Sequence, residues 1–303
     1  MADVARGAAA ATRTGTVGAL VAAMADVLST DLASVDALRE ARELLAAIHD
    51  MPRHWPTLEQ GTGVNADEWS RALLAAERRA AGAPLQYAAG RASFRHLTLD
   101  VDERVLIPRP ETELLIDIVL DALRGEPGGI AVDVGTGSGA IALALANEGQ
   151  FDRVIGTDVS LDALAVARAN ATRCAQVLRA PVELRAGSLL GPVPERPLRA
   201  VVSNPPYIAW GERDALPASV RDWEPTVALF SGSDGMDATV RLVRDAARSL
   251  GARCLLAIEV DTRRASLVAE LVATAGAYDE VRVQLDLTGR ERFVVARRRE
   301  AWG

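Results

Sequence analysis

The feature that most constrains the fold is a regular alternation of short apolar runs with helical stretches, which begins after Pro110 and continues to the end of the chain. Apolar runs of about four to eight residues between turn residues are typical of buried strands, whereas apolar residues three or four apart predict helices. Seven strands are expected, at Ile130–Val134, Arg153–Asp158, Val182–Ala186, Ala200–Ser203, Cys254–Val260, Val281–Asp286 and Phe293–Arg297. Five helices are expected with them, at Glu111–Leu123, Ala140–Asn147, Leu161–Ala175, Met236–Leu250 and Arg263–Ala275.

This alternation predicts an α/β fold with a mostly parallel sheet covered on both faces and right-handed crossovers between strands. In such sheets a ligand binds in the crevice at the carboxyl ends of the strands. The last two expected strands are separated only by a short turn around residues 287–291, so they must pair antiparallel. We therefore expect a seven-stranded, mostly parallel sheet with an antiparallel last strand.

The first part of the chain has a different pattern. Between Val17 and Ala81 the apolar residues recur at helical spacing, and Asn65 is placed to cap a helix that runs to Arg79. Residues 84–108 change to short alternating segments, at Ser93–Leu97, Leu99–Val101 and Val105–Ile107. We expect a helical N-terminal domain at 1–83 with a frayed start of about 15 residues, a β-hairpin linker at 84–108 and an α/β domain at 109–303.

Composition excludes several classes of protein. Of the 303 residues, 49% are hydrophobic and 25% are charged, which are values of a globular chain rather than a disordered one. The formal net charge of −7 supplies no general positive field for a nucleic-acid backbone, so direct nucleic-acid binding is not expected. The apolar stretch Val17–Leu28 is too short for a bilayer, and Cys174 and Cys254 suit reduced thiols, so we expect a cytoplasmic protein without a membrane partner.

A glycine-rich turn at residues 133–140 (DVGTGSGA) follows the first expected strand and leads directly into a helix. Glycines let the backbone bend sharply and approach a ligand closely, and the first amides of the helix point toward the ligand. Such a turn alone also fits a dinucleotide site or a tight turn that binds nothing. The candidate cofactor residues in it are Asp133, Gly135, Thr136, Gly137, Ser138 and Gly139.

Two carboxylates narrow the choice of ligand. Asp133 precedes the glycines, where an acidic side chain can pair with the amino group of an amino-acid-like ligand. Asp158 ends the second expected strand, 19 residues after Gly139, where a carboxylate accepts hydrogen bonds from ribose hydroxyls. A ligand with an amino acid at one end and a nucleoside at the other satisfies both, which favours S-adenosylmethionine as the cofactor.

The most informative loop is NPPY, at residues 204–207, directly after the fourth expected strand. Its two prolines prevent a strand or helix from continuing and remove two backbone donors, so carbonyls remain free to accept. Asn204 Oδ1 and the Pro205 carbonyl can both accept from one NH2 group, and the Tyr207 ring can flank a planar amide or base. Asn204, Pro205 and Tyr207 are the candidate catalytic residues. With Pro206 they form the candidate substrate site, and Asn204 is also a candidate cofactor contact.

The chemistry expected of this loop is methylation of a planar nitrogen. Such a nitrogen is a poor nucleophile because its lone pair is delocalised. Holding both of its hydrogens, with the lone pair aimed at an electrophilic methyl group, is catalysis by orientation and electrostatics and needs no strong base.

Together these motifs resemble the S-adenosylmethionine-dependent release factor N5-glutamine methyltransferases, the PrmC or HemK family, over nearly all of the chain after residue 84. The similar stretches are 84–87 (PLQY) with Gly90, 106–113 (LIPRPETE), the glycine loop, 203–208 (SNPPYI), 224–225 (EP) with 228–230 (ALF), and 234–235 (DG). The resemblance implies a helical N-terminal domain that recognises a peptide-chain release factor and a Rossmann-like methyltransferase domain. It also implies that the substrate is the glutamine of a Gly-Gly-Gln motif.

Two stretches depart from the family pattern. The third expected strand ends in residues 187–189 (GSL), where family members often carry an acidic residue and then an aromatic one. Ser188 and Leu189 are therefore the candidate contacts on the adenine side of the cofactor, in place of the usual pair. Residues 259–264 (EVDTRR) follow the fifth strand and lack the glycines common there.

Other activities remain open at this stage. A glutamine methyltransferase acting on a ribosomal protein would share the NPPY loop, although residues 108–112 (PRPET) favour a release factor. A nucleic-acid adenine N6-methyltransferase would need a basic groove and a target-recognition domain, which this acidic chain does not supply. A non-enzymatic assembly factor that binds S-adenosylmethionine would have no use for an intact NPPY loop.

For several other polar residues, the sequence context indicates a structural role. His49, His54 and His96 lack the spacing and carboxylate companions of a metal site, so no metal is expected. Arg297–Arg299 is interpreted as the solvated end of the last strand. Arg109 lies between two prolines and is expected to support the site rather than to react.

Overall fold

The computed structural model describes residues 15–29, 34–126 and 128–300, and they form two compact units. One unit comprises the described residues up to Ala92 together with Ala218–Trp223, and the other comprises the described residues from Ser93 to Pro217 and from Glu224 to Glu300. The expected frayed start falls on residues 1–14, outside the described part of the chain. Within the described ranges, no helix has the length and apolar character needed to cross a membrane.

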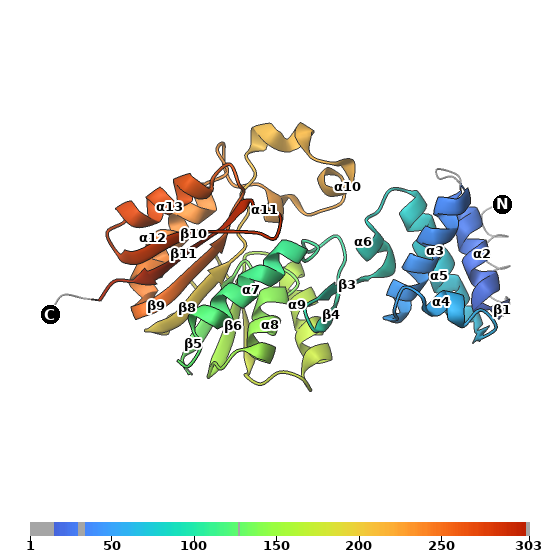
Figure 1. The fold of residues 1–303 in the computed structure, drawn as a ribbon, viewed down its shortest axis with the longest axis horizontal. Helices are drawn as coiled ribbons and strands as arrows, with labels where there is room; N and C mark the ends of the chain where they lie inside the picture. Colours follow the sequence, from blue (N-terminus) through green and yellow to red (C-terminus); the bar gives the residue numbers. More distant parts are fainter. Residues whose placement is uncertain (1–14, 30–33, 127, 301–303) are drawn as a thin grey trace. The chain divides into compact units, whose positions relative to one another are not determined.

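The first unit is a small helical bundle (Figure 1). Its apolar core includes Leu20, Met24, Leu44 and Leu45, which are fully buried. The predicted cap at Asn65 is confirmed as a capping box, because its side chain accepts from the backbone N–H of Glu68 and the Glu68 carboxylate accepts from the backbone N–H of Asn65. The elements of this unit are β1 (Gly15–Thr16), α2 (Val17–Leu28), α3 (Ser34–His49), α4 (Trp55–Leu58), β2 (Gly63–Val64), α5 (Ala66–Ala80), α6 (Leu85–Ala89) and α10 (Ala218–Arg221).

The second unit is built on a seven-stranded sheet in the order β10-β11-β9-β8-β5-β6-β7. Strands β7, β6, β5, β8 and β9 are parallel, and β11 is antiparallel to both of its neighbours, which confirms the predicted sheet. The strands are β5 (Ile130–Val134), β6 (Arg153–Asp158), β7 (Val182–Ala186), β8 (Leu198–Ser203), β9 (Leu250–Glu259), β10 (Tyr278–Leu285) and β11 (Glu291–Arg298).

Helices cover both faces of this sheet (Figure 1). Helices α7 (Pro110–Ala122), α8 (Ala140–Glu148) and α9 (Leu161–Cys174) contribute to one apolar core. Helices α12 (Asp237–Ser249) and α13 (Ala265–Thr274) contribute to the other. All five agree with the sequence prediction to within two residues at each end.

The expected linker differs from the prediction. It begins with α6, followed by strands β3 (Arg91–Phe94) and β4 (Leu97–Asp100), which form a two-stranded sheet. Residues 105–107, the third alternating segment of the linker, form no strand. The sequence analysis also missed η1 (Trp210–Ala215), α10 and α11 (Thr226–Leu229), each of which has at most six residues and so shows little periodicity.

The arginine run at the end of β11 is not simply solvated. Arg297 donates to the backbone carbonyls of Arg253 and Ala122, and Arg298 donates to Ala247. Arg299 forms an ion pair with Asp279 at 2.9 Å. The first two guanidinium groups therefore bind a carbonyl within β9 and carbonyls in the last turns of α7 and α12, instead of presenting a free positive surface.

Candidate functional site

A cavity of about 220 Å³ lies where β5, β6, β7 and β8 end. Its position matches the expected crevice at the carboxyl ends of the parallel strands. Its walls combine apolar side chains with a few polar groups, a combination typical of small-molecule sites. The lining includes Val134, Gly135, Gly137, Asp158, Ser188, Leu189, Asn204, Pro205 and Pro206, together with Arg104, Leu106, Ala163, Pro225, Val227 and Arg241.

Asp133 lies beneath the glycine loop and not on the cavity wall. Its side chain is fully buried, and Oδ2 accepts from Thr136 Oγ1 at 2.6 Å and from the backbone N–H of Ala142 at 3.0 Å. Helix α8 begins after Gly139, which has no side chain to cap it, so Asp133 supplies the missing cap. Burial raises the pKa of Asp133 to about 7, because desolvation outweighs these hydrogen bonds.

Asp158 has the position expected of a ribose acceptor. It lies at the end of β6 on the cavity wall, and its two oxygens accept from the backbone N–H groups of Gly137 and Ser160, each at 2.9 Å. An ionised carboxylate has about four acceptor sites, so each oxygen retains a lone pair for a ligand. A Cβ atom built on Gly137, whose φ is +53°, would meet no atom within 4 Å. The loop therefore leaves open space for close approach.

Asn170 ties the glycine loop to the rest of the unit, and the sequence analysis missed it. Its side chain is completely buried on α9. Nδ2 donates to the carbonyl oxygens of Ser138, at 2.9 Å, and of Asp100, at 3.0 Å. Oδ1 accepts from the Asp100 N–H at 2.7 Å. One amide thus fixes the loop against β4.

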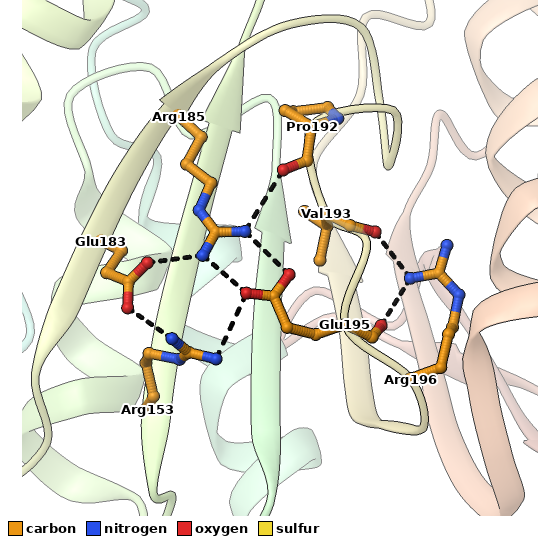
Figure 2. A network of polar contacts seen from close by, with 7 residues as sticks. All are labelled: Arg153, Glu183, Arg185, Pro192, Val193, Glu195 and Arg196. Atoms are coloured by element: carbon orange, nitrogen blue, oxygen red, sulfur yellow. Dashed lines mark hydrogen bonds and ion pairs between the residues drawn. The ribbon is translucent and has the colours of Figure 1, made fainter.

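The loop after β7, which contains Ser188 and Leu189, is held by a network of ion pairs (Figure 2). Arg185 donates to Glu183 at 2.6 Å, to Glu195 at 2.7 Å and to the Pro192 carbonyl at 3.2 Å. The hydrogen bond from Arg185 lowers the pKa of Glu195 to about 2. Because the network joins β7 to residues 192–195, it fixes the loop that lines the cavity between them.

The NPPY loop is supported from two sides. Before it, Ser203 Oγ donates to the carbonyl of Val134 in β5 at 2.7 Å. After it, the N–H of Ile208 donates to the Leu229 carbonyl at 3.0 Å. Gly235 has a φ of +81°, and a Cβ there would lie 2.3 Å from the Tyr207 carbonyl oxygen. Only glycine permits that close approach of the two backbones.

Asn204 is joined to two buried residues that the sequence analysis did not connect with it. Asn204 Nδ2 donates to Thr112 Oγ1 at 3.2 Å, and Thr112 Oγ1 donates to Glu259 Oε2 at 2.7 Å. The exposed fractions of Thr112 and Glu259 are 4% and 1%. Burial raises the pKa of Glu259 to about 7, although the Thr112 hydrogen bond opposes this effect.

Tyr207 and Arg109 border this group of residues. Burial raises the pKa of Tyr207 to about 12, and the nearby Glu259 carboxyl adds to the shift. Arg109 donates to both oxygens of the buried Glu224, at 2.7 and 2.6 Å. This ion pair gives Arg109 the structural role that its position between prolines predicted.

The structure brings most of the predicted site residues to one cavity. Gly135, Gly137, Asp158, Ser188, Leu189, Asn204, Pro205 and Pro206 line it. Asp133, Thr136, Ser138, Gly139 and Tyr207 are not among its lining residues. Among the residues that the structure describes, no group of three or more His, Cys, Asp or Glu side chains is arranged to hold a metal ion.

Two family models match parts of this chain. The PrmC N-terminal domain model matches residues 28–90, and the methyltransferase small domain model matches residues 111–217. The release factor glutamine methyltransferase of Deinococcus radiodurans is 40% identical over 259 residues, which cover 86% of this chain and 90% of the relative. That of Gloeobacter violaceus is 45% identical over 212 residues, which cover 70% of this chain and 73% of the relative.

Among solved structures, the catalytic domain of hMettl16 in complex with MAT2A 3'UTR hairpin 6 superposes with a TM-score of 0.53 at 15% sequence identity. The match covers 79% of this chain and 84% of that chain, and it shows the fold alone. These two sequence relatives are matched over 70% and 86% of this chain, and both are named release factor glutamine methyltransferase. The chain therefore belongs to the release factor glutamine methyltransferase family, whose members are S-adenosylmethionine-dependent enzymes.

Proposed function

We propose that this protein transfers a methyl group from S-adenosylmethionine to the side-chain amide nitrogen, N5, of the glutamine in the Gly-Gly-Gln motif of peptide-chain release factors. One observation carries the proposal. The cavity that Asp158 and the glycine loop line is also lined by Asn204 and Pro205, so a nucleoside acceptor and an amide cradle face the same space.

The residues present fit the cofactor. The half-buried Asp158 carboxylate has unused lone pairs for two ribose hydroxyls, and Leu106, Ala163 and Leu189 offer apolar wall for a base. The open space above Gly137 admits close contact with the loop. When bound, S-adenosylmethionine supplies an electrophilic methyl group on a sulfonium.

The substrate end of the cavity orients the nucleophile. Asn204 Oδ1 and the Pro205 carbonyl accept the two N–H bonds of the glutamine amide, which leaves the nitrogen lone pair directed along the cavity. No ionised general base is needed, because the N–C bond forms as the S–C bond breaks, the thioether leaves with the bonding electron pair, and the nitrogen then releases one proton to solvent. Tyr207 remains neutral at physiological pH, so it acts through its ring rather than as a base.

The proposal includes the partner and the compartment. The N-terminal unit, whose residues 28–90 match the PrmC N-terminal domain, recognises the release factor, and the reaction takes place in the cytoplasm where release factors work. The relatives named as release factor glutamine methyltransferases support this assignment.

The test is methyl transfer to a purified release factor, with the modified residue located by mass spectrometry. The Asn204→Ala variant is expected to bind the cofactor normally and to lose about a hundredfold in kcat, the loss typical of one oriented polar group. Asn204→Asp keeps an acceptor but not the amide and should also be slow. Modification of a ribosomal protein or of adenine in nucleic acid, with the release factor unmodified, would replace the proposal by one of those activities.

A further inference from the structure

We propose that Thr112 and Glu259 are positioning residues that fix the orientation of the Asn204 side-chain amide, so that its carbonyl oxygen faces the cavity. The inference rests on the proposed function, because it assigns to Asn204 Oδ1 the task of accepting the substrate N–H. Neither Thr112 nor Glu259 lines the cavity, so both act through Asn204.

The direction of the hydrogen-bond chain fixes the amide. A hydroxyl group has one proton to donate, and an ionised carboxylate can only accept. Thr112 therefore gives its proton to Glu259 Oε2, at 2.7 Å, and turns a lone pair toward Asn204. That lone pair accepts from Asn204 Nδ2 at 3.2 Å. The NH2 half of the amide is thus directed to Thr112, and the oxygen is left for the cavity.

The same hydrogen-bond donors and acceptors disfavour the reversed orientation of the Asn204 side-chain amide. With Asn204 turned over, its oxygen and Glu259 Oε2 would both face the Thr112 hydroxyl, which has a single proton. One acceptor would remain unpaired beside residues that are 4% and 1% exposed, where water does not replace the lost bond. The substrate nitrogen would also meet an NH2 group instead of an oxygen.

The three residues come from separate elements that meet beside the cavity. Thr112 lies in the first turn of α7, Asn204 directly follows β8, and Glu259 ends β9. Strands β8 and β9 are paired in parallel, so their carboxyl ends lie together. Thr112 and Glu259 thus lie in regular elements and Asn204 directly follows one, which suits a positioning role.

Protonation of Glu259 would remove the fixed donor-to-acceptor direction of this hydrogen-bond chain. Burial raises the pKa of this carboxyl, to about 7, and a protonated carboxyl could donate to Thr112 and release the amide. The charged groups that act on Glu259 are Arg292 of β11, with Arg109 and Glu111 at the start of α7; Tyr207 beside it is neutral. The arginines oppose protonation, and Glu111 favours it. We expect turnover to fall as the pH falls through about 7.

The first experiment compares Thr112→Val, Thr112→Ser and Ser249→Ala in the complete protein. Thr112→Val is nearly isosteric and removes the hydroxyl, so kcat should fall by about 10- to 100-fold while cofactor affinity stays unchanged. Thr112→Ser restores the hydroxyl and should restore most of the rate. Ser249→Ala is the control, because it removes another buried hydroxyl, which donates to the Asp245 carbonyl in α12. Ser249 is far from Asn204 in the sequence, so this variant should leave kcat unchanged.

The second experiment measures kcat against pH for the wild type and Glu259→Gln. The wild type should lose activity below about pH 7, whereas the variant should be slow and should lack that acidic limb, because its amide can both donate and accept at any pH. A purely structural role would lower activity without flattening the profile. An unchanged acidic limb in Glu259→Gln, or wild-type kcat in Thr112→Val, would overturn the inference.

A third measurement needs no protein substrate and separates this inference from the proposed function. Infrared titration should show two carboxyl groups that titrate near pH 7, Asp133 and Glu259, and Glu259→Gln should remove the Glu259 band. Thr112→Val should shift that band to higher pH, because the carboxylate loses its hydrogen-bond donor. If Thr112→Val leaves the Glu259 band unshifted, the inferred hydrogen-bond chain is refuted, even if the enzyme methylates release factors. Failure of the wild type to modify a release factor would refute the proposed function while this titration still decides the inference.

Discussion

Replacement of Asp133 by asparagine tests whether this carboxylate supports the glycine loop from beneath or contacts the cofactor directly. Its Oδ2 atom accepts from Thr136 and Ala142, and Oδ1 has no hydrogen-bond partner in the described structure. Asp133→Asn keeps the shape and one acceptor oxygen for these bonds. It removes the ionisation.

The magnitude follows from the burial of the carboxyl. The pKa of Asp133 rises from 3.8 to about 7, and a shift of about 3 units corresponds to about 4 kcal/mol. The folded pKa lies above the unfolded one, so the folded protein binds more protons between about pH 4 and pH 7. The Asp133 contribution to stability is therefore greatest below pH 4, is lost as the pH rises to about 7, and is constant above it.

The assay is urea unfolding of the wild type, Asp133→Asn and Asp162→Asn at several pH values between about 4 and 8. As the pH rises across this range, the free energy of unfolding of Asp133→Asn should increase relative to that of the wild type by up to about 4 kcal/mol. Asp162→Asn removes the same charge from an exposed position in the first turn of α9 and should show no such gain.

Cofactor affinity completes the test of Asp133. Because its side chain does not line the cavity, Asp133→Asn should change the affinity for S-adenosylmethionine by less than about threefold. Parallel stability profiles for wild type and variant would refute the burial argument. A large loss of affinity with unchanged stability would instead assign Asp133 to the amino group of the cofactor.

Two further outcomes are expected. Asp158→Asn should weaken S-adenosylmethionine binding by about 1.5 to 3 kcal/mol, the range for a hydrogen bond to a charged group. Calorimetry tests this with Asp162→Asn as the control variant, and equal affinities of the two variants would contradict the ribose assignment. Glu195→Gln should lower stability by about 1 kcal/mol or less, since the ion pairs of Glu195 are partly exposed. Its effect should shrink in thermal melts at high salt, and salt-independent melting differences would argue against a charge network.

Long-range periodicity made the α/β sheet predictable, and short elements escaped prediction for a physical reason. Each expected helix of the second unit has several turns over which apolar spacing accumulates. Helices α6, α10 and α11 have four or five residues, too few to be stable alone, so tertiary contacts decide whether they form. The alternating segment Val105–Ile107 forms no strand for a different reason, since Val105 and Ile107 are buried without pairing into a sheet.

The candidate site was predictable where it depends on strand ends and not where it depends on side-chain direction. Parallel strands bring their carboxyl ends together, so Asp158 and Asn204 were placed at one crevice from the sequence. Asp133 is the next-to-last residue of β5, and whether its side chain points to the cavity or beneath the loop depends on packing. Thr112 and Glu259 are 147 positions apart, so no local pattern links them.

Behind each end of the cavity lies a carboxyl group that the fold removes from water, and ionisation of one of them, Glu259, affects stability and activity in opposite directions. Asp133 caps α8 beneath the glycine loop, and Glu259 accepts the Thr112 hydroxyl proton, which leaves a Thr112 lone pair for Asn204. Each pKa is raised to about 7 by burial, so each group lowers stability as the pH rises toward that value. The ionised form of Glu259, which is the costlier one for the fold, is the form that holds the Asn204 amide in the orientation needed to bind a substrate N–H. Ionisation of Glu259 therefore supports activity while it reduces the contribution of this group to stability, and Glu259→Gln, which cannot ionise, would remove the source of that orientation.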